Sequence, residues 1–270
     1  MFRSKQKFVT GNSNGSLSLF DKNRLLKSKS LAGIRVMVAY FNGQIVAAAK
    51  NGKLTIMNED LETLKEIPGT REQPLCITGN ATYLVMSDWG GFVRYYKRNS
   101  NEQSKVFFSS LLLKSLLQTY MHLGRTESVH VANNLVLSGS ADNTLQAFDM
   151  EKHQKLWEFD NEHEIRGSVL LDDKLLACSD KVVIMLAWEK GELLQRLNNY
   201  DFCYNIDLSP NGSLLAVACN SAVALWDIKN AVRVKEFKLG TNIFDLRFNP
   251  SGDKLIAGTN DGEIFEIEMK

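Results

Sequence analysis

The sequence lacks a charge imbalance, a long hydrophobic run and a sorting signal. Its 32 lysines and arginines nearly balance 31 aspartates and glutamates, so no overall field draws the protein to nucleic acid or to an acidic membrane. No apolar run approaches the roughly 18 residues of a membrane span, and the charged start of the chain is not typical of a secretory signal. We therefore expect a soluble protein of the cytoplasm or nucleus that does not insert into a membrane.

Cysteine, histidine and catalytic motifs are also scarce. The four cysteines lack Cys-x-x-Cys spacing and lie in apolar surroundings, so we interpret them as small core side chains rather than zinc ligands or disulfides. No histidine stands at metal-ligand spacing from a cysteine or carboxylate. Phosphate loops and nucleophile elbows are absent, and Gly90-Gly91 is interpreted as a hairpin turn. The sequence thus predicts no catalytic residue, metal or cofactor, although an enzyme built from residues distant in sequence stays open.

What the sequence does contain is one pattern repeated seven times. Each copy is an apolar run ending in small residues, a short polar turn, and an alternating strand that closes on a large apolar residue. Five of the six steps between closing residues span 37 to 41 residues, whereas the step from Tyr96 to Phe148 spans 52. A length near 40 residues is that of one four-stranded propeller blade. The closing residues are Phe20, Met57, Tyr96, Phe148, Trp188, Trp226 and Ile267.

The residues of each copy predict a β-hairpin. Turns such as Asn14-Gly15, Asn51-Gly52 and Asp261-Gly262 supply residues that adopt positive φ, and aliphatic residues flank them. Alternation, as in Leu17 and Leu19, directs one face of each strand inward. Further strands precede and follow several hairpins, so each copy predicts one small antiparallel sheet.

The sixth copy carries a resemblance to a known family. Residues 205–216, followed by Ala224-Leu225-Trp226-Asp227, resemble a WD repeat, and the theme recurs over most of the chain. The resemblance implies a single all-β domain over residues 1–270, a seven-bladed β-propeller of WD40 type. The chain is divergent, because Trp-Asp occurs in one repeat only and Gly-His is absent. The family's hydrogen-bond network of His, Asp, Ser or Thr and Trp is matched only by His163, Asp180 and Trp188, with Ser179 as a loose fit.

The long step and the last copy depart from the pattern. Residues 99–125 are interpreted as an insertion between blades 3 and 4, with helical spacing of apolar residues over 111–122. Such a helix either covers an edge of its own blade, the interpretation we favour, or binds a partner. The sequence ends at Lys270 after the third strand of the last blade. We expect either a closing strand from a missing upstream segment, or an incomplete blade whose edge over 263–268 accepts a partner strand.

Five residues form the candidate partner-binding surface. In WD repeats one position just inside the innermost strand points to the upper face near the channel, and the resemblance places Arg35, Cys76, Arg166, Tyr204 and Phe244 there, with Ser128 as a weaker match. Trp89 lies in a hairpin turn that reaches the same face. Arginine, tyrosine and tryptophan are enriched in binding hot spots, so we predict a surface on this face that binds a peptide or a domain of a partner. The predicted surface consists of Arg35, Trp89, Arg166, Tyr204 and Phe244. In the alternative interpretation, Trp89 folds over its own blade and the aromatics of 202–204 pack between blades.

These observations predict a non-enzymatic scaffold or adaptor for protein partners, a subunit of a larger complex. A propeller associated with RNA or ribonucleoprotein is the alternative; it would use Arg35, Arg71, Arg166 and the basic residues of 22–29. We instead interpret residues 22–29 as an outer strand whose lysines protect an edge from aggregation. An enzyme with a site in the channel is the third hypothesis.

Overall fold

The computed structural model describes residues 7–21, 24–31, 36–41, 43–67, 73–97, 122–199 and 201–269. Over these ranges the chain forms 25 β-strands joined by turns and contains no helix, which confirms the all-β prediction. Across the same ranges, nothing has the length and apolar character of a membrane-spanning helix.

The strands form seven antiparallel sheets with their strands in chain order, and we call these sheets blades 1 to 7. Blade 1 contains β1 (Lys7–Gly11), β2 (Ser16–Asp21) and β3 (Arg24–Ser30), and blade 2 contains β4 (Met37–Phe41), β5 (Gln44–Ala48), β6 (Leu54–Met57) and β7 (Thr63–Ile67). Blade 3 contains β8 (Pro74–Gly79), β9 (Tyr83–Asp88) and β10 (Val93–Lys97), and blade 4 contains β11 (Thr126–Ala132), β12 (Leu135–Ser140), β13 (Thr144–Asp149) and β14 (Gln154–Asp160).

The remaining three blades follow the same up-and-down order. Blade 5 contains β15 (Gly167–Leu171), β16 (Lys174–Ser179), β17 (Val182–Ala187) and β18 (Glu192–Asn198). Blade 6 contains β19 (Cys203–Leu208), β20 (Leu214–Cys219), β21 (Ala222–Asp227) and β22 (Val232–Lys238), and blade 7 contains β23 (Ile243–Phe248), β24 (Lys254–Thr259) and β25 (Ile264–Glu268). The predicted number of seven blades is confirmed. Among the described strands, β25 pairs only with β24.

Glycine closes the hairpins as the sequence predicts. Gly15, Gly52 and Gly262 have φ angles of 83°, 73° and 83°, a left-handed conformation that glycine adopts without a Cβ clash. At the first of these turns, the Oδ1 atom of Asn14 accepts a hydrogen bond of 3.1 Å from the Ser16 N–H. The turns fix the strand register, and the register in turn buries Leu17 and Leu19.

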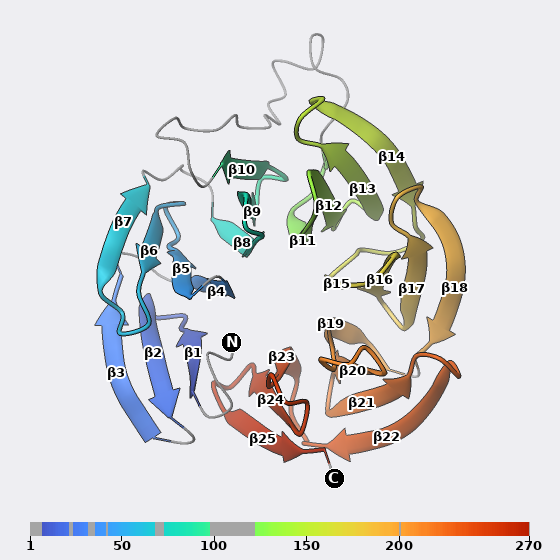
Figure 1. The fold of residues 1–270 in the computed structure, drawn as a ribbon. Helices are drawn as coiled ribbons and strands as arrows, with labels where there is room; N and C mark the ends of the chain where they lie inside the picture. The colour runs from blue at the N-terminus through green and yellow to red at the C-terminus, as the bar shows by residue number, and fades with distance from the viewer. Residues whose placement is uncertain are drawn as a thin grey trace. The chain divides into compact units, whose positions relative to one another are not determined.

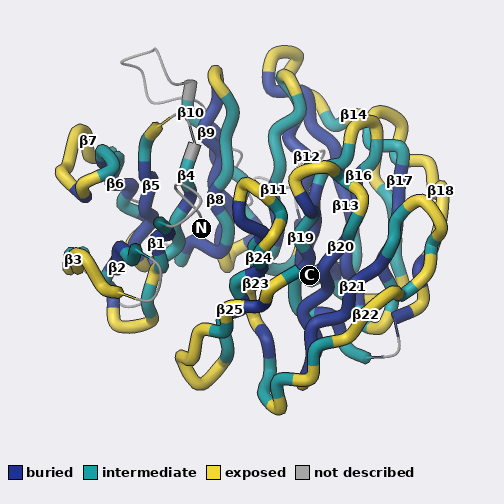
Figure 2. The backbone as a smooth tube through the Cα atoms, turned by 60° about the horizontal axis from the view of Figure 1, so that its bottom comes forward, coloured by how far each residue is buried: buried dark blue, intermediate teal, exposed yellow. Residues whose placement is uncertain are grey.

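Burial follows the order of strands within a blade. The middle strands are almost entirely buried, as in β9, β16 and β20, whereas the outer strands β3, β7, β18 and β22 are largely exposed, which Figure 2 shows as dark blue and yellow tubes. The two faces of the middle strands pack against neighbouring blades. One such core joins blades 5 and 6 and contains Leu176, Val183, Leu197, Ile206 and Trp226.

The chain divides into two compact units. One comprises Met1–Ser140 and Phe148–Lys155, and the other comprises Ala141–Ala147 and Leu156–Lys270. In the first unit the inner strands β1, β4, β8 and β11 contact one another in succession, and in the second unit β15, β19 and β23 do the same (Figure 1). Residues that start the inner strands of one unit are thereby brought together.

The long step between Tyr96 and Phe148 contains residues 98–121, which lie outside the described ranges. The predicted helix over 111–122 therefore falls almost entirely there, as does most of the insertion over 99–125. The chain resumes at His122, whose ring nitrogen Nε2 lies 2.8 Å from the Ser138 hydroxyl, and continues into β11.

Candidate protein-binding surface

In blades 6 and 7, a bulge at the start of the inner strand displays one side chain. In β19 the register passes from the Cys203–Cys219 pair to the Asn205–Ala218 pair, which leaves Tyr204 between them. In β23 it passes from Ile243–Thr259 to Asp245–Gly258 and leaves Phe244 between them. Such a bulge re-aims the extra side chain away from the regular alternation of the strand.

Arg166 takes the corresponding position in blade 5. Gly167 pairs with Cys178, the fifth residue of β16, just as Asn205 pairs with the fifth residue of β20. The N–H of Arg166 also donates to the Cys178 carbonyl over 3.0 Å. Arg166, Tyr204 and Phe244 therefore occupy equivalent positions in three successive blades, as the WD-repeat resemblance implies.

These three residues and Phe202 form a continuous stack that we call the aromatic row. The ring centroids of Phe202 and Tyr204 are 5.1 Å apart, and those of Tyr204 and Phe244 are 4.8 Å apart. The Arg166 guanidinium lies 4.7 Å from the centre of the Phe202 ring and 5.9 Å from that of Tyr204. Both distances are within the range of cation–π attraction. Four side chains from three blades thus share one surface.

Polar contacts hold the aromatic row in place. The Tyr204 hydroxyl donates to Asn220 Oδ1 over 3.0 Å, and Asn220 Nδ2 donates to Asp201 Oδ1 over 2.8 Å. That same aspartate oxygen accepts the Phe202 N–H over 2.8 Å, and Arg166 forms an ion pair of 3.2 Å with Glu164. A binding surface whose side chains are already ordered loses less conformational entropy when a partner docks.

The aromatic row is open at one end. Phe244 is 48% exposed, whereas Arg166, Phe202 and Tyr204 are of intermediate burial. The alternative interpretation, in which the aromatics of 202–204 pack between blades, describes the inner part of the row, because Tyr204 contacts rings of its own blade and of blade 7. It leaves the exposed ring of Phe244 unexplained.

Trp89 lies at the tip of the β9–β10 hairpin in the first unit and is 52% exposed. Its ring centre is 5.3 Å from the guanidinium of Arg125, which precedes β11. Trp89 therefore contacts a residue beside the next blade.

A buried ion pair stiffens the hairpin that carries Trp89. Asp88 and Arg94 pair below its tip, and Asp88 Oδ1 accepts the N–H groups of Gly90 and Phe92 over 3.0 Å each. Burial raises the pKa of the Asp88 carboxyl, although the Arg94 charge and these hydrogen bonds act in the opposite direction. The Asp88 carboxylate, held by Arg94 and by the two N–H groups of the turn, therefore fixes the turn that carries Trp89.

The sequence assigned the wrong register in blades 2 to 4. Cys76 and Ser128 pair with Ser87 and Gly139, the fifth residues of β9 and β12, and so occupy the position of Asn205. The position equivalent to Tyr204 is taken in these two blades by Leu75, which is buried, and by Glu127. In blade 2, Met37 pairs with the last residue of β5, which assigns the displayed position to the buried Val36 instead of Arg35. Arg35 itself lies outside the described residues.

Two further sequence interpretations can be compared with the geometry. His163 Nε2 lies 3.8 Å from Asp180 Oδ2, and the Ser179 hydroxyl donates to the His163 carbonyl over 3.1 Å. The Trp188 indole instead donates to the Asp172 carbonyl over 2.8 Å, so the proposed four-residue network is wrong in its tryptophan.

The lysines of β3 make contacts within their own unit. Lys27 Nζ donates to the Asp60 carbonyl over 2.7 Å, and Lys29 Nζ donates to the Leu61 carbonyl over 2.9 Å. These bonds tie β3 to the turn before β7.

Metal ligands and cysteines are the remaining groups on which the sequence predictions bear over the described ranges. No group of three or more His, Cys, Asp or Glu residues there is arranged to hold a metal ion. All four cysteines are free thiols, and burial raises the pKa of Cys178 to about 12. A thiol with that pKa stays protonated and is a poor nucleophile at neutral pH.

Known proteins resemble this chain at the level of repeat and fold. The family model described as "WD domain, G-beta repeat" matches residues 191–227, from the residue before β18 to the end of β21. Among solved structures, the WD40 β-propeller domain of Doa1 has a TM-score of 0.83 and 15% sequence identity, covering 100% of this chain and 92% of that chain. At this identity the likeness shows the fold alone, which is the seven-bladed propeller of WD40 type.

Curated relatives extend the same likeness. The chain is 34% identical over 92 residues to eukaryotic translation initiation factor 3 subunit I of Aspergillus terreus, covering 33% of this chain and 27% of that protein. It is 24% identical over 159 residues to small ribosomal subunit protein RACK1y of Oryza sativa subsp. japonica, covering 53% of this chain and 47% of that protein. The chain thus spans about a quarter to a half of these relatives' lengths. The WD-repeat resemblance drawn from the sequence is confirmed.

Proposed function

We propose that this protein is a non-enzymatic scaffold that binds a protein partner through the aromatic row. The observation that carries the proposal is the stack of Arg166, Phe202, Tyr204 and Phe244, because it gathers hot-spot residue types from three blades on one ordered surface. The occupant is a peptide or domain that covers Phe244. Trp89 and Arg125 form a second contact point in the first unit.

The relatives support a place within a larger assembly. One relative is by name a subunit of a translation initiation factor, and another is by name a ribosomal protein. We extend to this chain the role of subunit in a multiprotein complex of the cytoplasm. We also propose that residues 1–270 act as one propeller domain.

Comparative purification tests the role of the aromatic row. Tagged wild-type protein should retain its partner, whereas Phe244→Ala and Tyr204→Ala should each lower the recovered amount at least 10-fold, which corresponds to about 1.4 kcal/mol. Leu64→Ala is the control, because Leu64 is 56% exposed on β7 and lies outside the row. Equal recovery by all three variants, with unchanged melting temperatures, would exclude the aromatic row as the binding surface.

Association with ribonucleoprotein is a second candidate, favoured by the relative named as a ribosomal protein. Arg166 would then contact phosphate rather than protein. Binding through phosphates weakens steeply between low and physiological salt, whereas an aromatic interface hardly changes. Partner retention across a salt series therefore distinguishes the two functions.

The edge of β25 is a further candidate contact. Its strand pairs with β24 alone among the described strands, and two of its five residues, Glu266 and Glu268, are glutamates. We propose that a strand pairs along this edge, by the β-addition that exposed sheet edges permit. Charged side chains on the edge limit promiscuous pairing, and one of them, Glu266, forms an ion pair with Lys254 of β24.

A further inference from the structure

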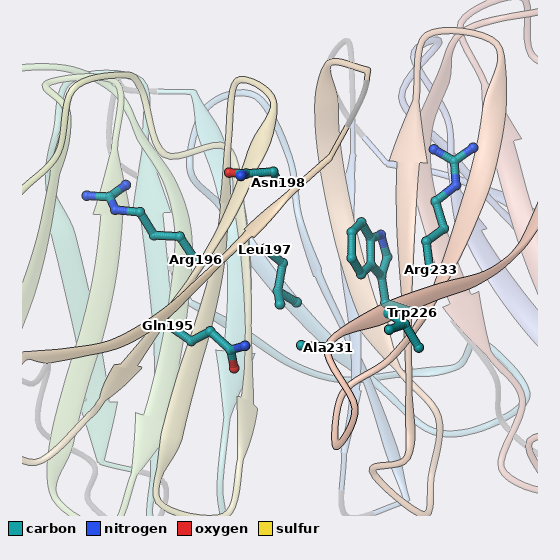
Figure 3. A pocket seen from close by; sticks show the side chains of 8 residues that line it. Gln195, Arg196, Leu197, Asn198, Trp226, Ala231 and Arg233 are labelled. Carbon is teal, nitrogen blue, oxygen red and sulfur yellow. The ribbon is translucent and has the colours of Figure 1, made fainter.

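A cavity of about 590 Å³ lies between the outer parts of blades 5 and 6, in the second unit. We call it the outer groove, and Figure 3 shows it from close by. Its volume is within the range of about 300–1,000 Å³ that is typical of ligand sites. β18, β21, the turn before β22, and β22 supply its lining, which consists of Gln195, Arg196, Leu197, Asn198, Trp226, Ala231, Val232 and Arg233.

The outer groove has an apolar floor with polar groups around it. In Figure 3, Leu197 and Gln195 extend from β18 toward Trp226 and Ala231, whereas the Arg196 guanidinium points away from the gap. Trp226 is only 5% exposed, and its indole N–H has no hydrogen-bond acceptor among the described residues. The Trp226 ring and the buried Leu197 side chain form an apolar floor, and this floor suits an apolar side chain.

The two outer strands beside the groove expose aliphatic side chains. Leu193 and Leu194 on β18 are exposed, and so are Val232 and Val234 on β22, at 49% and 53%. Clusters of exposed apolar residues around a concavity are typical of binding sites for other proteins. An occupant that extends beyond the cavity along β18 would cover Leu193 and Leu194.

Charge indicates the sign of that occupant. β22 carries three cationic side chains, Arg233, Lys235 and Lys238, against one carboxylate, Glu236, which pairs with Arg233 on the groove wall. An acidic partner is attracted to this strand and a basic one is repelled, which gives specificity and a faster encounter.

We propose that the outer groove is a second docking site, separate from the aromatic row, for an extended acidic peptide segment of a partner protein. One bulky apolar side chain of the segment enters the cavity against Trp226 and Leu197. Carboxylates beside it face the cationic side chains of β22. The groove would let the protein hold two partners at once, which is the property that a scaffold requires.

Selection from a random 12-residue peptide library tests the proposal. The library is panned on the wild-type chain, and recovered peptides are then measured for affinity to the Val232→Glu and Val234→Glu variants. Val232 lines the groove and Val234 does not, although both lie on the same strand at similar exposure. Melting temperatures of both variants are measured as a check on folding.

We expect enriched peptides that carry an apolar residue flanked by Asp or Glu. Their Kd should rise at least 10-fold in Val232→Glu and less than 3-fold in Val234→Glu, and it should be unchanged in Tyr204→Ala. Enrichment of basic peptides, equal loss in both valine variants, or an absence of peptides that depend on Val232 would each overturn the proposal. Displacement by a single-stranded RNA oligonucleotide instead of by peptides would assign the cationic strand to nucleic acid and would also overturn it.

Discussion

Replacing Trp226 by alanine should destabilise the protein strongly without acting on the aromatic row. The side chain is 5% exposed and packs in the core shared by blades 5 and 6, against residues such as Leu197 and Val217. Truncating a buried tryptophan costs about 3–5 kcal/mol. For a chain of this size that loss lowers the melting temperature by roughly 6–20 °C, at about 2–4 °C per kcal/mol.

The unpaired indole N–H makes a second substitution more informative. Phenylalanine buries about 50–100 Å² less than tryptophan, a loss of about 1.3–2.5 kcal/mol at about 25 cal/mol per Å². It also removes a buried donor that has no acceptor, and such a donor costs about 1–3 kcal/mol. The two effects nearly cancel, so Trp226→Phe should change stability by less than about 1 kcal/mol.

Differential scanning calorimetry of the wild type, Trp226→Ala and Trp226→Phe measures both effects. Trp188→Ala is the control, since Trp188 is less buried and its indole donates to the Asp172 carbonyl. A melting temperature of Trp226→Ala close to that of the wild type would refute the burial argument. If the phenylalanine variant is as unstable as the alanine variant, the Trp226 indole N–H donates a hydrogen bond in solution, and the argument from an unpaired donor is wrong.

Three further predictions follow from local geometry. Gly91→Ala should lower the free energy of unfolding, measured by urea denaturation, more than Gly262→Ala does. Both glycines have positive φ, but a Cβ at Gly91 would lie 2.5 and 2.7 Å from the carbonyl oxygens of His122 and Gly124, whereas nothing lies within 4 Å of a Cβ at Gly262. Equal losses of stability in the two variants would contradict this close approach. Asp88→Asn should destabilise the chain by about 3–5 kcal/mol, because it leaves the buried charge of Arg94 without its carboxylate, and a loss below about 1 kcal/mol would show that the pair is not buried in solution. Hydrogen exchange of the outward-facing amides of β25 should be much faster than that of β21 at Val223–Trp226, and equal protection would eliminate the strand-docking proposal.

The sequence predicted the blades well because their signals are local. Turn glycines, alternating aliphatic residues and a step near 40 residues each act within one hairpin, so the seven copies could be counted without knowing how they pack. The WD-repeat resemblance further implies that Trp226 lies between neighbouring sheets, and the structure places it in the core shared by blades 5 and 6.

The residues at the start of each inner strand, unlike the number of blades, could not be predicted reliably from the sequence. A bulge adds one residue to a strand without a distinctive residue type, so the assignment was correct at Tyr204 and Phe244 but one residue off at Cys76 and Ser128. Phe202 was noticed as one of several clustered aromatics but left out of the candidate surface. Its place under the Arg166 guanidinium depends on contact between two blades, which is a tertiary property.

The unusual acceptor of Trp188 has the same origin. The family pattern predicts the residue types of a hydrogen-bond network, but the partner of an indole N–H depends on which carbonyl the neighbouring turn presents. Asp172 adopts a φ of 50° in that turn, and its carbonyl receives the bond. Side-chain partners that depend on turn conformation are beyond what spacing can indicate.

Site-specific photo-crosslinking tests the central claim most directly. p-Benzoylphenylalanine in place of Phe244 should crosslink to one discrete protein in cells, because the exposed end of the aromatic row is the proposed contact. The same group in place of Leu64, which is also exposed, should give no comparable product. Two results would contradict a scaffold that binds its partner through the aromatic row. In one, the Phe244 position crosslinks to RNA; in the other, it crosslinks to no macromolecule while the Leu64 position captures a protein.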